Sequence, residues 1–588
     1  MKENLMKIIV LFNKNEKKLL ILIFFMMILA ALLETISIGI IIPFIGIVTN
    51  PNTINKEPIL TLVYNNMNFN SQISFIIFSA MCLILIFLLK NSYLLFFHYI
   101  QNKLILNQQV KLSRKLFKSY LTKPYTFHLQ RNTADLLRNV NEEVPKIFQG
   151  IIMSSFQLFT EILVIFCILS LLMFSAPIPT IVCSILLVSN ILLFFKYFRR
   201  KISNLGTEQQ KINGNLIKWI NQGLGASKEI KVSGKQDFFI DSYTLQNQKK
   251  ANNSLYMKML DHVPRYFIET LLVSVVLITM VVVVLQKDNA SSLISTMALF
   301  AMAAFRLMPS INRVVAMIST IRYCQPALNV INEDMINTKK IYDSTTIYNN
   351  TSPIGKENRV FRNSICLKQV SFKYPNQKDY SIRNITLTIP IGNSVAFIGE
   401  SGAGKTTIVD IILGLLMPEQ GQVLVDGHNI QDQILIWQKN IGYIPQNIFL
   451  TDDSISSNIA FGIPKDDIDE EAVWNALEKA QLKDFVDSLP NKLNTEVGER
   501  GVRLSGGQRQ RIGIARALYN DPEIIFMDEA TSALDNETEK GIMKSIERLK
   551  GEKTLIIIAH RLSTIENCDL VFKINKGKLA SVENTWGA

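Results

Sequence analysis

The sequence predicts two structurally different parts, an all-α membrane region followed by an α/β domain that contains a P-loop. The first 315 of the 588 residues hold almost all of the long apolar runs. The later residues alternate short apolar runs with helical stretches, a pattern typical of α/β domains. Within them, "NSVAFIGESGAGKTTIVDIILGLL" (393–416) places a glycine-rich loop between a strand and a helix. We expect residues 1–315 to form the membrane domain, 316–358 a linker and 359–588 the α/β domain.

Six apolar segments are long enough to cross a hydrocarbon core of about 30 Å. They are 19–48, 73–100, 151–174, 178–198, 266–286 and 291–313. The first continues to Val48 and contains no small-residue cleavage site, so we do not expect a removed signal peptide.

The distribution of basic residues orients these spans. Segments 101–150 and 196–265 contain nine and thirteen Lys and Arg residues, whereas the other three connections together contain only Lys56 and Lys287. Positive-inside counting therefore predicts that both termini lie in the cytoplasm. The net charge of +13 follows from this topology, and we expect no nucleic-acid partner.

The two basic connections are too helical for plain loops. "RNTADLLRNVNEEVPKIF" (131–148) has apolar residues at helical spacing, so we expect membrane helices that continue into the cytoplasm and are joined by short transverse turns. The glycines of "NQGLGASKEIKVSGKQ" (221–236) would break the helix at the second turn. The outer connection 51–71 could form a small amphipathic surface helix or an ordinary loop.

The P-loop supplies the first candidate site. Gly399, Gly402 and Gly404 would let backbone N–H groups curl around phosphate oxygens. Lys405 would meet the terminal phosphates, and the Thr406 hydroxyl could bind Mg²⁺. The helix that follows adds the positive end of its dipole.

A second apolar strand, "IIFMDEA" (524–530), ends in two carboxylates. Ligands bind at the carboxyl ends of strands in α/β sheets. Asp528 is therefore a candidate Mg²⁺ ligand, and Glu529 is a candidate base that accepts a proton from the attacking water.

Three further motifs complete the pattern: "LSGGQRQR" (504–511), "TSALD" (531–535) and "IIIAHRLS" (556–563). In this order the sequence from about 365 to 580 resembles the ATP-binding cassette domain. The resemblance implies that His560 contacts the γ-phosphate and that Gln446 senses Mg²⁺. It assigns ATP binding to Tyr374, Gly399, Glu400, Ser401, Gly402, Ala403, Gly404, Lys405, Thr406, Thr407, Ser505, Gly506, Gly507, Gln508 and Asp535. It assigns Mg²⁺ to Thr406, Gln446 and Asp528, and catalysis to Glu529, His560 and Gln446.

The resemblance also implies a dimer. In this family each ATP site is composed of one subunit's P-loop and the partner's signature motif, and this chain has one of each. A symmetric homodimer with twelve spans is the economical expectation. Spans that precede a cassette give the half-transporter layout of ABC exporters, in which a domain-swapped dimer is expected. "TEVGERG" (495–501) resembles the cross-talk segment of exporters.

Polar groups inside the spans are the candidates for contact with cargo. Glu34, Lys90, Glu161, Glu269 and Arg306 are costly in hydrocarbon and are expected to face the bundle interior. With Arg265 and Arg313, the basic members could form a positive layer low in the cavity. The alternative is that these cations snorkel to the membrane interface and fix topology.

Four local sequences resemble bacterial lipid-linked oligosaccharide flippases of the PglK type: "LLETISIGIIIPFIG", "VPRYFIETL", "FRLMPSINR" and "GYIPQNIFL". The resemblance implies ATP-driven flipping, in the bacterial inner membrane, of a polyprenyl-pyrophosphate-linked glycan for protein glycosylation. A belt of arginines is proposed to bind the pyrophosphate in those flippases. The matching positions here are Lys90, Arg265, Arg306 and Arg313. Lysine at position 90 keeps the charge but loses the bidentate fork of arginine.

The alternative function is export of another amphipath, such as a lipid A-like lipid, a peptide or a drug, by the same ATP-driven machinery. A soluble cassette ATPase that acts on nucleic acid would need no membrane spans. A channel or receptor regulator would not need the full set of hydrolytic groups, all of which are present.

Overall fold

The computed structural model of the chain forms two compact units. It describes residues 14–49, 58–67, 69, 71–175, 177–285, 290–344, 361–375, 377–528, 551–559, 565 and 568–584. The first unit runs to Lys123 and continues from Arg131 to Ser344, whereas the second combines Pro124–Gln130 with the chain after Ser344. The first unit is all-α and the second is α/β, as the sequence predicts.

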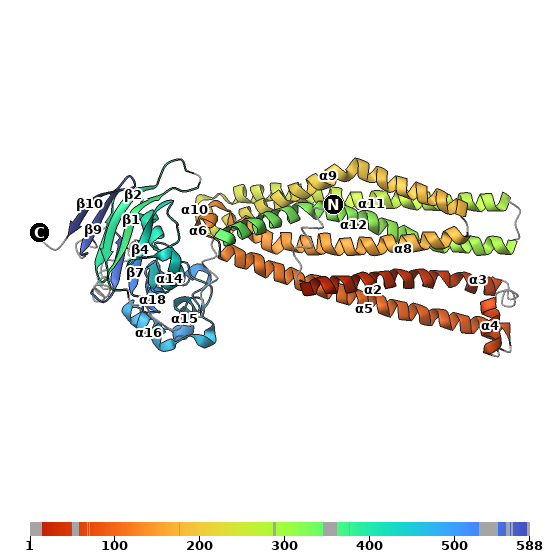
Figure 1. The fold of residues 1–588 in the computed structure, drawn as a ribbon, viewed down its shortest axis with the longest axis horizontal. Helices are drawn as coiled ribbons and strands as arrows, with labels where there is room; N and C mark the ends of the chain where they lie inside the picture. The colour runs from red at the N-terminus through yellow and green to blue at the C-terminus, as the bar shows by residue number, and fades with distance from the viewer. Residues whose placement is uncertain are drawn as a thin grey trace. The chain divides into compact units, whose positions relative to one another are not determined.

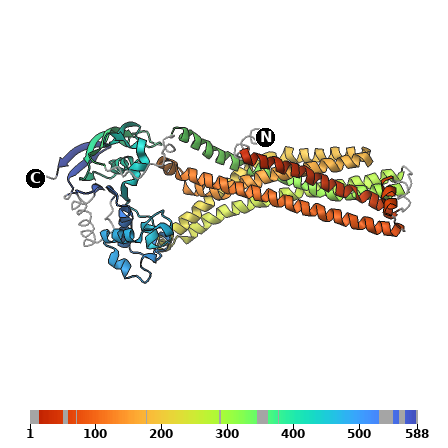
Figure 2. The same cartoon turned by 60° about the horizontal axis from the view of Figure 1, so that its bottom comes forward.

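The first unit consists of long helices that run side by side (Figures 1 and 2). Its elements are α2 (Lys14–Gly39), α3 (Ile41–Thr49), α4 (Pro58–Asn66), α5 (Gln72–Leu121), α7 (Thr133–Arg138), the π-helical η2 (Asn139–Glu143) and η3 (Lys146–Met153), α8 (Ser154–Ser175), α9 (Pro177–Gly225), α10 (Ser227–Ser233), α11 (Gln236–Leu285) and α12 (Ala290–Ser344).

Four helical stretches in the described part of the chain are long and apolar enough to cross a membrane. They are Glu16–Ser37, Gln72–Leu121, Thr133–Met173 and Leu307–Met335. On α5, large apolar side chains such as Ile73, Leu89 and Leu95 are 64–75% exposed. A soluble protein rarely leaves such a stripe uncovered, so this face of α5 fits contact with lipid.

The first predicted span, 19–48, is broken near its C-terminal end. Helix α2 ends at Gly39 and α3 begins at Ile41. Pro43 has no N–H to donate to the carbonyl of Gly39, and glycine is itself a poor helix former. The proline therefore accounts for the break.

A π-helical stretch precedes the third span. Segments η2 and η3 flank Pro145, which cannot donate the α-helical hydrogen bond. The wider π turns follow from the resulting gap in the i→i−4 ladder. The predicted helical character of 131–148 is thus confirmed, although the helix is partly of the π type.

The transverse turns lie between the long helices, as the sequence predicts. Helix α6 (Tyr125–Gln130) connects α5 to α7, and α10 connects α9 to α11. Gly234 ends α10 with φ = +64°, a conformation that glycine adopts without strain. In the outer connection 51–71, residues 58–66 form a helix, α4, rather than a loop.

The expected boundary at residue 315 is wrong. Helix α12 continues through Pro326 to Ser344, and this whole stretch belongs to the first unit. Val315, Cys324, Leu328 and Ile331 are buried at helical spacing along it. The sequence estimate ended the domain with the last apolar run, but the helix is stabilised by packing beyond the predicted span.

A polar cluster of buried side chains joins three helical segments of the first unit. The Tyr120 hydroxyl donates to Asp334 Oδ2 at 2.6 Å, and Asn139 Nδ2 donates to the same oxygen at 3.0 Å. Burial and the neighbouring Asp334 carboxylate raise the pKa of Tyr120 above its usual value. These bonds join α5, η2 and α12 next to the point where the chain enters α6.

The second unit is built on two sheets. Its strands are β1 (Ser364–Phe372), β2 (Ile382–Pro390), β3 (Ser394–Ile398), β4 (Gln420–Val425), β5 (His428–Asn429), β6 (Ile441–Ile444), β7 (Ile524–Asp528), β8 (Thr554–Ile558), β9 (Leu570–Asn575) and β10 (Lys578–Asn584). Besides α6, its helices are α13 (Lys405–Ile412), α14 (Ile434–Lys439), α15 (Ile455–Ile459), α16 (Glu470–Lys479), α17 (Lys483–Asp487) and α18 (Gly506–Leu518).

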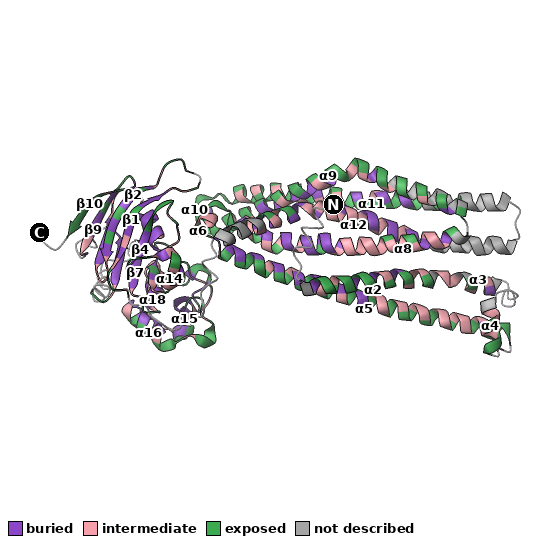
Figure 3. Cartoon of the chain, in the orientation of Figure 1, coloured by how far each residue is buried: buried purple, intermediate pink, exposed green. Residues whose placement is uncertain are grey.

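The larger sheet positions the site. Its order is β10-β9-β3-β8-β7-β6, with β3 parallel to β8 and β9, and β7 parallel to β6 and β8. The smaller antiparallel sheet has the order β2-β1-β4-β5. The inner strands β3, β7 and β8 of the larger sheet are buried, whereas β10 at its edge is mostly exposed (Figure 3). The P-loop after β3 and Asp528 at the end of β7 therefore lie at the carboxyl ends of parallel strands of the same sheet.

Candidate functional site

The P-loop backbone depends on its glycines. Gly399, Gly402 and Gly404 have φ values of +147°, +80° and +104°. A Cβ on Gly399 would lie 2.2 Å from the carbonyl oxygen of Ile574, so no other residue fits there. The loop leads directly into α13, whose first residues present free N–H groups. This conformation suits an anion.

Lys405 lies inside this loop. Its ammonium group donates to the carbonyl oxygens of Gly399 at 2.8 Å and Glu400 at 3.0 Å, and the residue is only 6% exposed. These acceptors are neutral, so a phosphate can take over the contact. The Thr406 residue next to it is exposed, which leaves its hydroxyl accessible to a cation.

Tyr374 adjoins the same loop. Its hydroxyl lies 3.3 Å from the Thr407 hydroxyl, and its ring packs edge-on against Phe372 at a centroid distance of 5.0 Å. Burial raises the pKa of the Tyr374 phenol. The sequence-predicted adenine contact is therefore placed beside the P-loop.

Carboxylates gather at the end of β7. Asp528 is half-buried at the last position of this strand. Burial, reinforced by the charge of Asp528, raises the pKa of Asp410 to about 6. Asp410 lies one turn after Thr406 on α13 and so shares its helix face. Carboxylate and hydroxyl oxygens are the ligands that Mg²⁺ prefers, so Thr406 and Asp528 fit the predicted cation.

The signature motif begins helix α18. Ser505 Oγ accepts the Gln508 N–H at 3.2 Å, and Gln508 Oε1 accepts the Ser505 N–H at 2.8 Å. This reciprocal capping box uses both side chains to start the helix. Gly506 and Gly507 then follow, with no side chain to cover their N–H groups.

The segment after Gln446 is locked to the signature helix. Arg516 of α18 donates to the carbonyl oxygens of Asn458 at 2.7 Å and Phe449 at 2.9 Å. Gly513 of α18 admits the Ile448 side chain, because a Cβ there would clash with it. Gln446 itself is exposed. These contacts join the segment after Gln446 directly to α18.

Three of the predicted site residues lie outside the described residues: Glu529, Asp535 and His560. The strands that precede the first and the last of them in the sequence, β7 and β8, are adjacent and parallel. Their predicted roles remain predictions.

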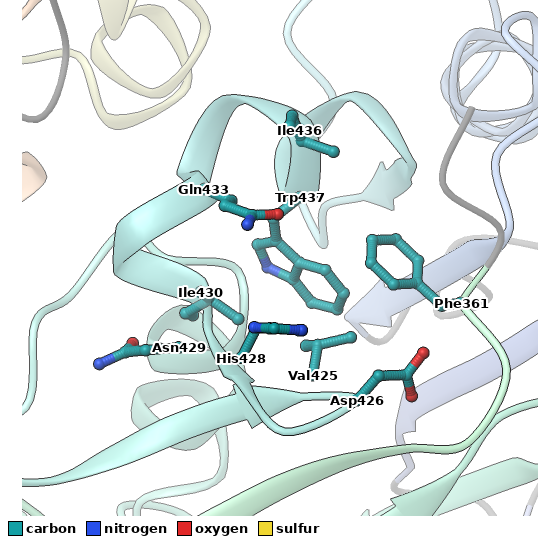
Figure 4. A pocket seen from close by; sticks show the side chains of 9 residues that line it. All are labelled: Phe361, Val425, Asp426, His428, Asn429, Ile430, Gln433, Ile436 and Trp437. Atoms are coloured by element: carbon teal, nitrogen blue, oxygen red, sulfur yellow. The ribbon is translucent and has the colours of Figure 1, made fainter. Parts of the chain in front are cut away.

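A separate cavity of about 200 Å³ lies beside α14 in the second unit. Figure 4 shows the Phe361 and Trp437 rings next to each other, with His428 below them. Trp437 Nε1 donates to the carbonyl oxygen of Ile412 at 2.7 Å, where α13 ends. None of the residues that line this cavity belongs to the predicted ATP site.

The first unit has a polar cavity of about 360 Å³ among α2, α5, α8 and α12. Arg313 lines it and is paired with Glu161: the guanidinium Nη2 donates to Glu161 Oε2 at 3.2 Å, and Nε contacts the other oxygen. The full lining is Ala30, Glu34, Leu94, Phe97, His98, Gln101, Gln157, Thr160, Glu161, Arg313 and Met317.

The other predicted cargo residues lie elsewhere. The Lys90 ammonium is 4.5 Å from the ring centre of Phe87, and Arg265 is an exposed residue of α11 next to Pro264. Neither lines the cavity that contains Arg313. The side chain of Arg306 lies outside the described residues. Glu269, also predicted to face the interior, is exposed within this single chain.

Sequence reasoning missed three features. Asp410 could have been found as the one acidic residue in the apolar run of the P-loop helix. Gln101 follows the second apolar run directly, a position that resembles any interfacial amide. The Glu161–Arg313 pair joins residues 152 positions apart, and no local pattern indicates which carboxylate meets which cation.

Comparison with known families covers both units. The ABC transporter transmembrane region matches residues 18–308, and the ABC transporter domain matches residues 382–532. An ATP-dependent lipid A-core flippase of Haemophilus influenzae is 30% identical over 477 residues, which are 80% of this chain and 78% of that protein. The chain belongs to the ABC transporter family. It has the organisation of an ABC exporter half-transporter, embedded in a membrane through several spans, whose cassette hydrolyses ATP to drive transport.

Other relatives agree with this assignment. The heterocyst differentiation ATP-binding protein HepA of Nostoc sp. is 29% identical over 571 residues, 94% of this chain and 89% of that protein. The structure of a bacterial Atm1-family ABC exporter with ATP bound superimposes with a TM-score of 0.75 at 22% identity, over 97% of this chain and 95% of that one. This likeness confirms the ABC exporter fold.

Proposed function

We propose that this ABC exporter flips a polyprenyl-pyrophosphate-linked oligosaccharide from the cytoplasmic to the outer leaflet of a bacterial inner membrane, with both termini in the cytoplasm. The observation that carries the proposal is the combination of an ATP-hydrolysing cassette with a polar, Arg313-containing cavity among apolar helices. A headgroup that is both charged and hydroxyl-rich needs such a path, whereas its polyprenyl tail can stay in lipid.

The cassette would work as one half of a homodimer. Lys405 exchanges its two carbonyl partners for the terminal phosphates of ATP. Gly506 and Gly507 present N–H groups at the start of α18 to the partner subunit's nucleotide. Thr406, Gln446 and Asp528 would hold Mg²⁺, which neutralises charge on the phosphates when bound.

Hydrolysis would rest on groups that follow β7 and β8. Glu529 accepts a proton from the attacking water, and His560 contacts the γ-phosphate; Asp535 communicates across the dimer. Gln446 reports the state of the site, and the bonds of Arg516 pass its movement to α18.

The cargo's pyrophosphate would be bound by Lys90, Arg265, Arg306 and Arg313. Charge-assisted bonds from guanidinium groups replace hydration that the anion loses. Arg313 can take part only if the anion competes with Glu161 for it. The belt would therefore bind the pyrophosphate more weakly than an equal number of free arginines.

A second candidate cargo is a lipid A-like lipid. Its support is the function of the Haemophilus influenzae relative, a lipid A-core flippase at 30% identity. Both candidates are lipids moved by the same ATP-driven machinery, and they differ in the headgroup and the tail.

The test is reconstitution of the full chain in liposomes with each labelled lipid in turn. ATP-dependent appearance of the polyprenyl-pyrophosphate glycan on the opposite leaflet is expected, and Glu529→Gln should abolish it. If this glycan does not move while ATP is hydrolysed normally, the proposal is wrong, and movement of lipid A would then favour the second candidate.

A further inference from the structure

The cavity in the first unit has the size of a ligand site. Its volume of about 360 Å³ falls in the range of roughly 300–1,000 Å³ that small-molecule sites occupy. Four different helices contribute to it. In the predicted topology, His98 and Gln101 lie where the second span meets the cytoplasm, so the cavity is at the level of the inner-leaflet headgroups.

Gln101 is the residue of this cavity whose environment indicates a bound ligand. It is 1% exposed, and neither its amide nitrogen nor its amide oxygen has a hydrogen-bond partner within the described residues. A buried amide without partners costs free energy. A ligand that both donates and accepts hydrogen bonds would recover it.

The arginine that lines the cavity, Arg313, is not a free cation. Arg313 and Glu161 form an ion pair in which both guanidinium and carboxylate contribute two atoms. Ser310 Oγ lies 3.5 Å from the guanidinium, at the limit of a hydrogen bond. The pair is close to neutral as a whole, and it still has lone pairs and N–H groups for a polar ligand.

These groups distinguish between headgroup chemistries. A phosphate only accepts hydrogen bonds, and it would face the carboxylates of Glu34 and Glu161. An ammonium group only donates hydrogen bonds, so it would offer no acceptor to the N–H groups of Arg313 and Gln101. A sugar hydroxyl both donates and accepts, and neighbouring hydroxyls match the two atoms of an amide or a carboxylate.

The remaining wall of the cavity is apolar. Leu94, Phe97 and Met317 line it together with Ala30. The C–H face of a sugar ring packs well on such a wall while its hydroxyls reach the polar side chains. The mixture of amide, ion pair and aromatic ring therefore fits a saccharide better than water alone or an anion.

We propose that this cavity binds a sugar ring of the transported lipid's headgroup, with Gln101 as the main hydrogen-bonding residue and the Glu161–Arg313 pair beside it. The proposal rests on the proposed function, because it assumes a cargo with a glycan. It assigns recognition of the sugar to Gln101 and attraction of the pyrophosphate to the basic residues, of which Arg313 also lines this cavity.

The test compares two lipids on the full chain in liposomes: undecaprenyl pyrophosphate that carries an oligosaccharide, and undecaprenyl pyrophosphate alone. The readout is the lipid concentration that gives half-maximal stimulation of ATP hydrolysis. Gln101→Met, which keeps length but removes both hydrogen-bonding atoms, should raise this concentration about tenfold for the glycosylated lipid. The value for the lipid without sugar should not change.

Gln108→Met is the matched control. Gln108 is buried on the same face of α5, seven residues further along, but does not line the cavity. It should leave basal ATP hydrolysis and both lipid responses unchanged. If Gln101→Met does not fold, Gln157→Leu removes a second amide from the cavity wall and should weaken the response to the glycosylated lipid alone.

The outcomes separate the two proposals. An equal shift for both lipids, or no shift for either, would overturn the sugar site, the latter because the cavity then holds only water. If the wild-type chain responds to neither lipid, the proposed function fails, and the comparison is repeated with lipid A that carries or lacks core sugars. A shift confined to the sugar-bearing lipid A then supports the cavity proposal, and its absence overturns it.

Discussion

Lys405 in the cassette and Arg313 in the membrane unit are both cations held by oxygen atoms of the protein. The partners of Lys405 are two neutral backbone carbonyls, whereas the partner of Arg313 is the carboxylate of Glu161. A phosphate displaces a carbonyl from an ammonium group with a gain in charge pairing. It displaces a carboxylate only by separating an existing ion pair. The same charge is therefore ready for an anion in one unit and already engaged in the other.

Removal of the cassette cation should give the largest effect. Lys405→Ala is expected to lower kcat/KM for ATP by about 10²–10³-fold, because the charge that meets the terminal phosphates is lost. Steady-state ATP hydrolysis measures it. Lys479→Ala, which removes a surface lysine paired with Asp521, is the matched control and should change the rate less than about twofold. Similar losses in both variants would mean that Lys405 has no special role.

Release of Arg313 from its ion pair should increase the apparent affinity for an anionic lipid. In Glu161→Gln the carboxylate that holds Arg313 becomes a neutral amide of the same shape. Half-maximal stimulation by undecaprenyl pyrophosphate should then need about 5–10-fold less lipid, since the anion no longer competes with Glu161. Glu269→Gln, on the exposed face of α11, is the control. An unchanged response in Glu161→Gln would show that Arg313 does not meet the pyrophosphate.

Asp410 of the cassette extends the comparison from cations to an acidic residue. The pKa of Asp410 is raised from 3.8 to about 6 by burial and by Asp528. The folded cassette thus binds more protons than the unfolded chain between about pH 4 and 6, and its stability falls as the pH rises through this window. Above it, Asp410→Asn should be more stable than the wild type by about 1–2 kcal/mol, less than the full shift because the side chain is only partly buried.

The melting temperature of the nucleotide-free cassette transition, recorded from pH 5 to 8, checks this. The wild type should lose stability relative to Asp410→Asn as the pH rises. Parallel curves for the two proteins would contradict the raised pKa.

The smallest effect is expected at Ser310. Its hydroxyl lies 3.5 Å from the Arg313 guanidinium, too far for a strong hydrogen bond. Ser310→Ala should change the melting temperature by an amount equivalent to about 0.5 kcal/mol or less, with no change in the lipid response. A large loss of lipid response would mean that Ser310, and not Glu161 alone, positions Arg313.

The sequence predicts the cassette better than the membrane unit because its signals are local. The residues that shape the P-loop lie within 393–416, and their spacing alone implies the observed strand, loop and helix. The carboxylates after β7 could be placed at the same edge because parallel strands end together. The break between α9 and α10 also follows from local sequence, because the glycines of 221–236 indicate it.

The membrane unit depends on contacts between distant segments. The continuation of α12 beyond residue 315 was missed because the packing of residues such as Cys324, Leu328 and Ile331, and not a long apolar run, sustains it. The pairing of Arg313 with Glu161, and the enclosure of Gln101, depend on how four helices are rotated relative to one another. No pattern within one span specifies that rotation.

The π-helical stretch at Lys146–Met153 has a bearing on how this chain tolerates insertions and deletions. A π turn accommodates one residue more than an α turn, so deletion of one residue there would let the segment become a regular α-helix. The α turn would then cover the same rotation with one residue fewer, so the residues of α8 would keep their orientation and Glu161 would stay beside Arg313. The same deletion within the regular helix α8, before Glu161, would rotate that residue by about 100° and separate the pair. Loss of one residue is therefore expected to be tolerated in the π-helical stretch and not between Ser154 and Glu161.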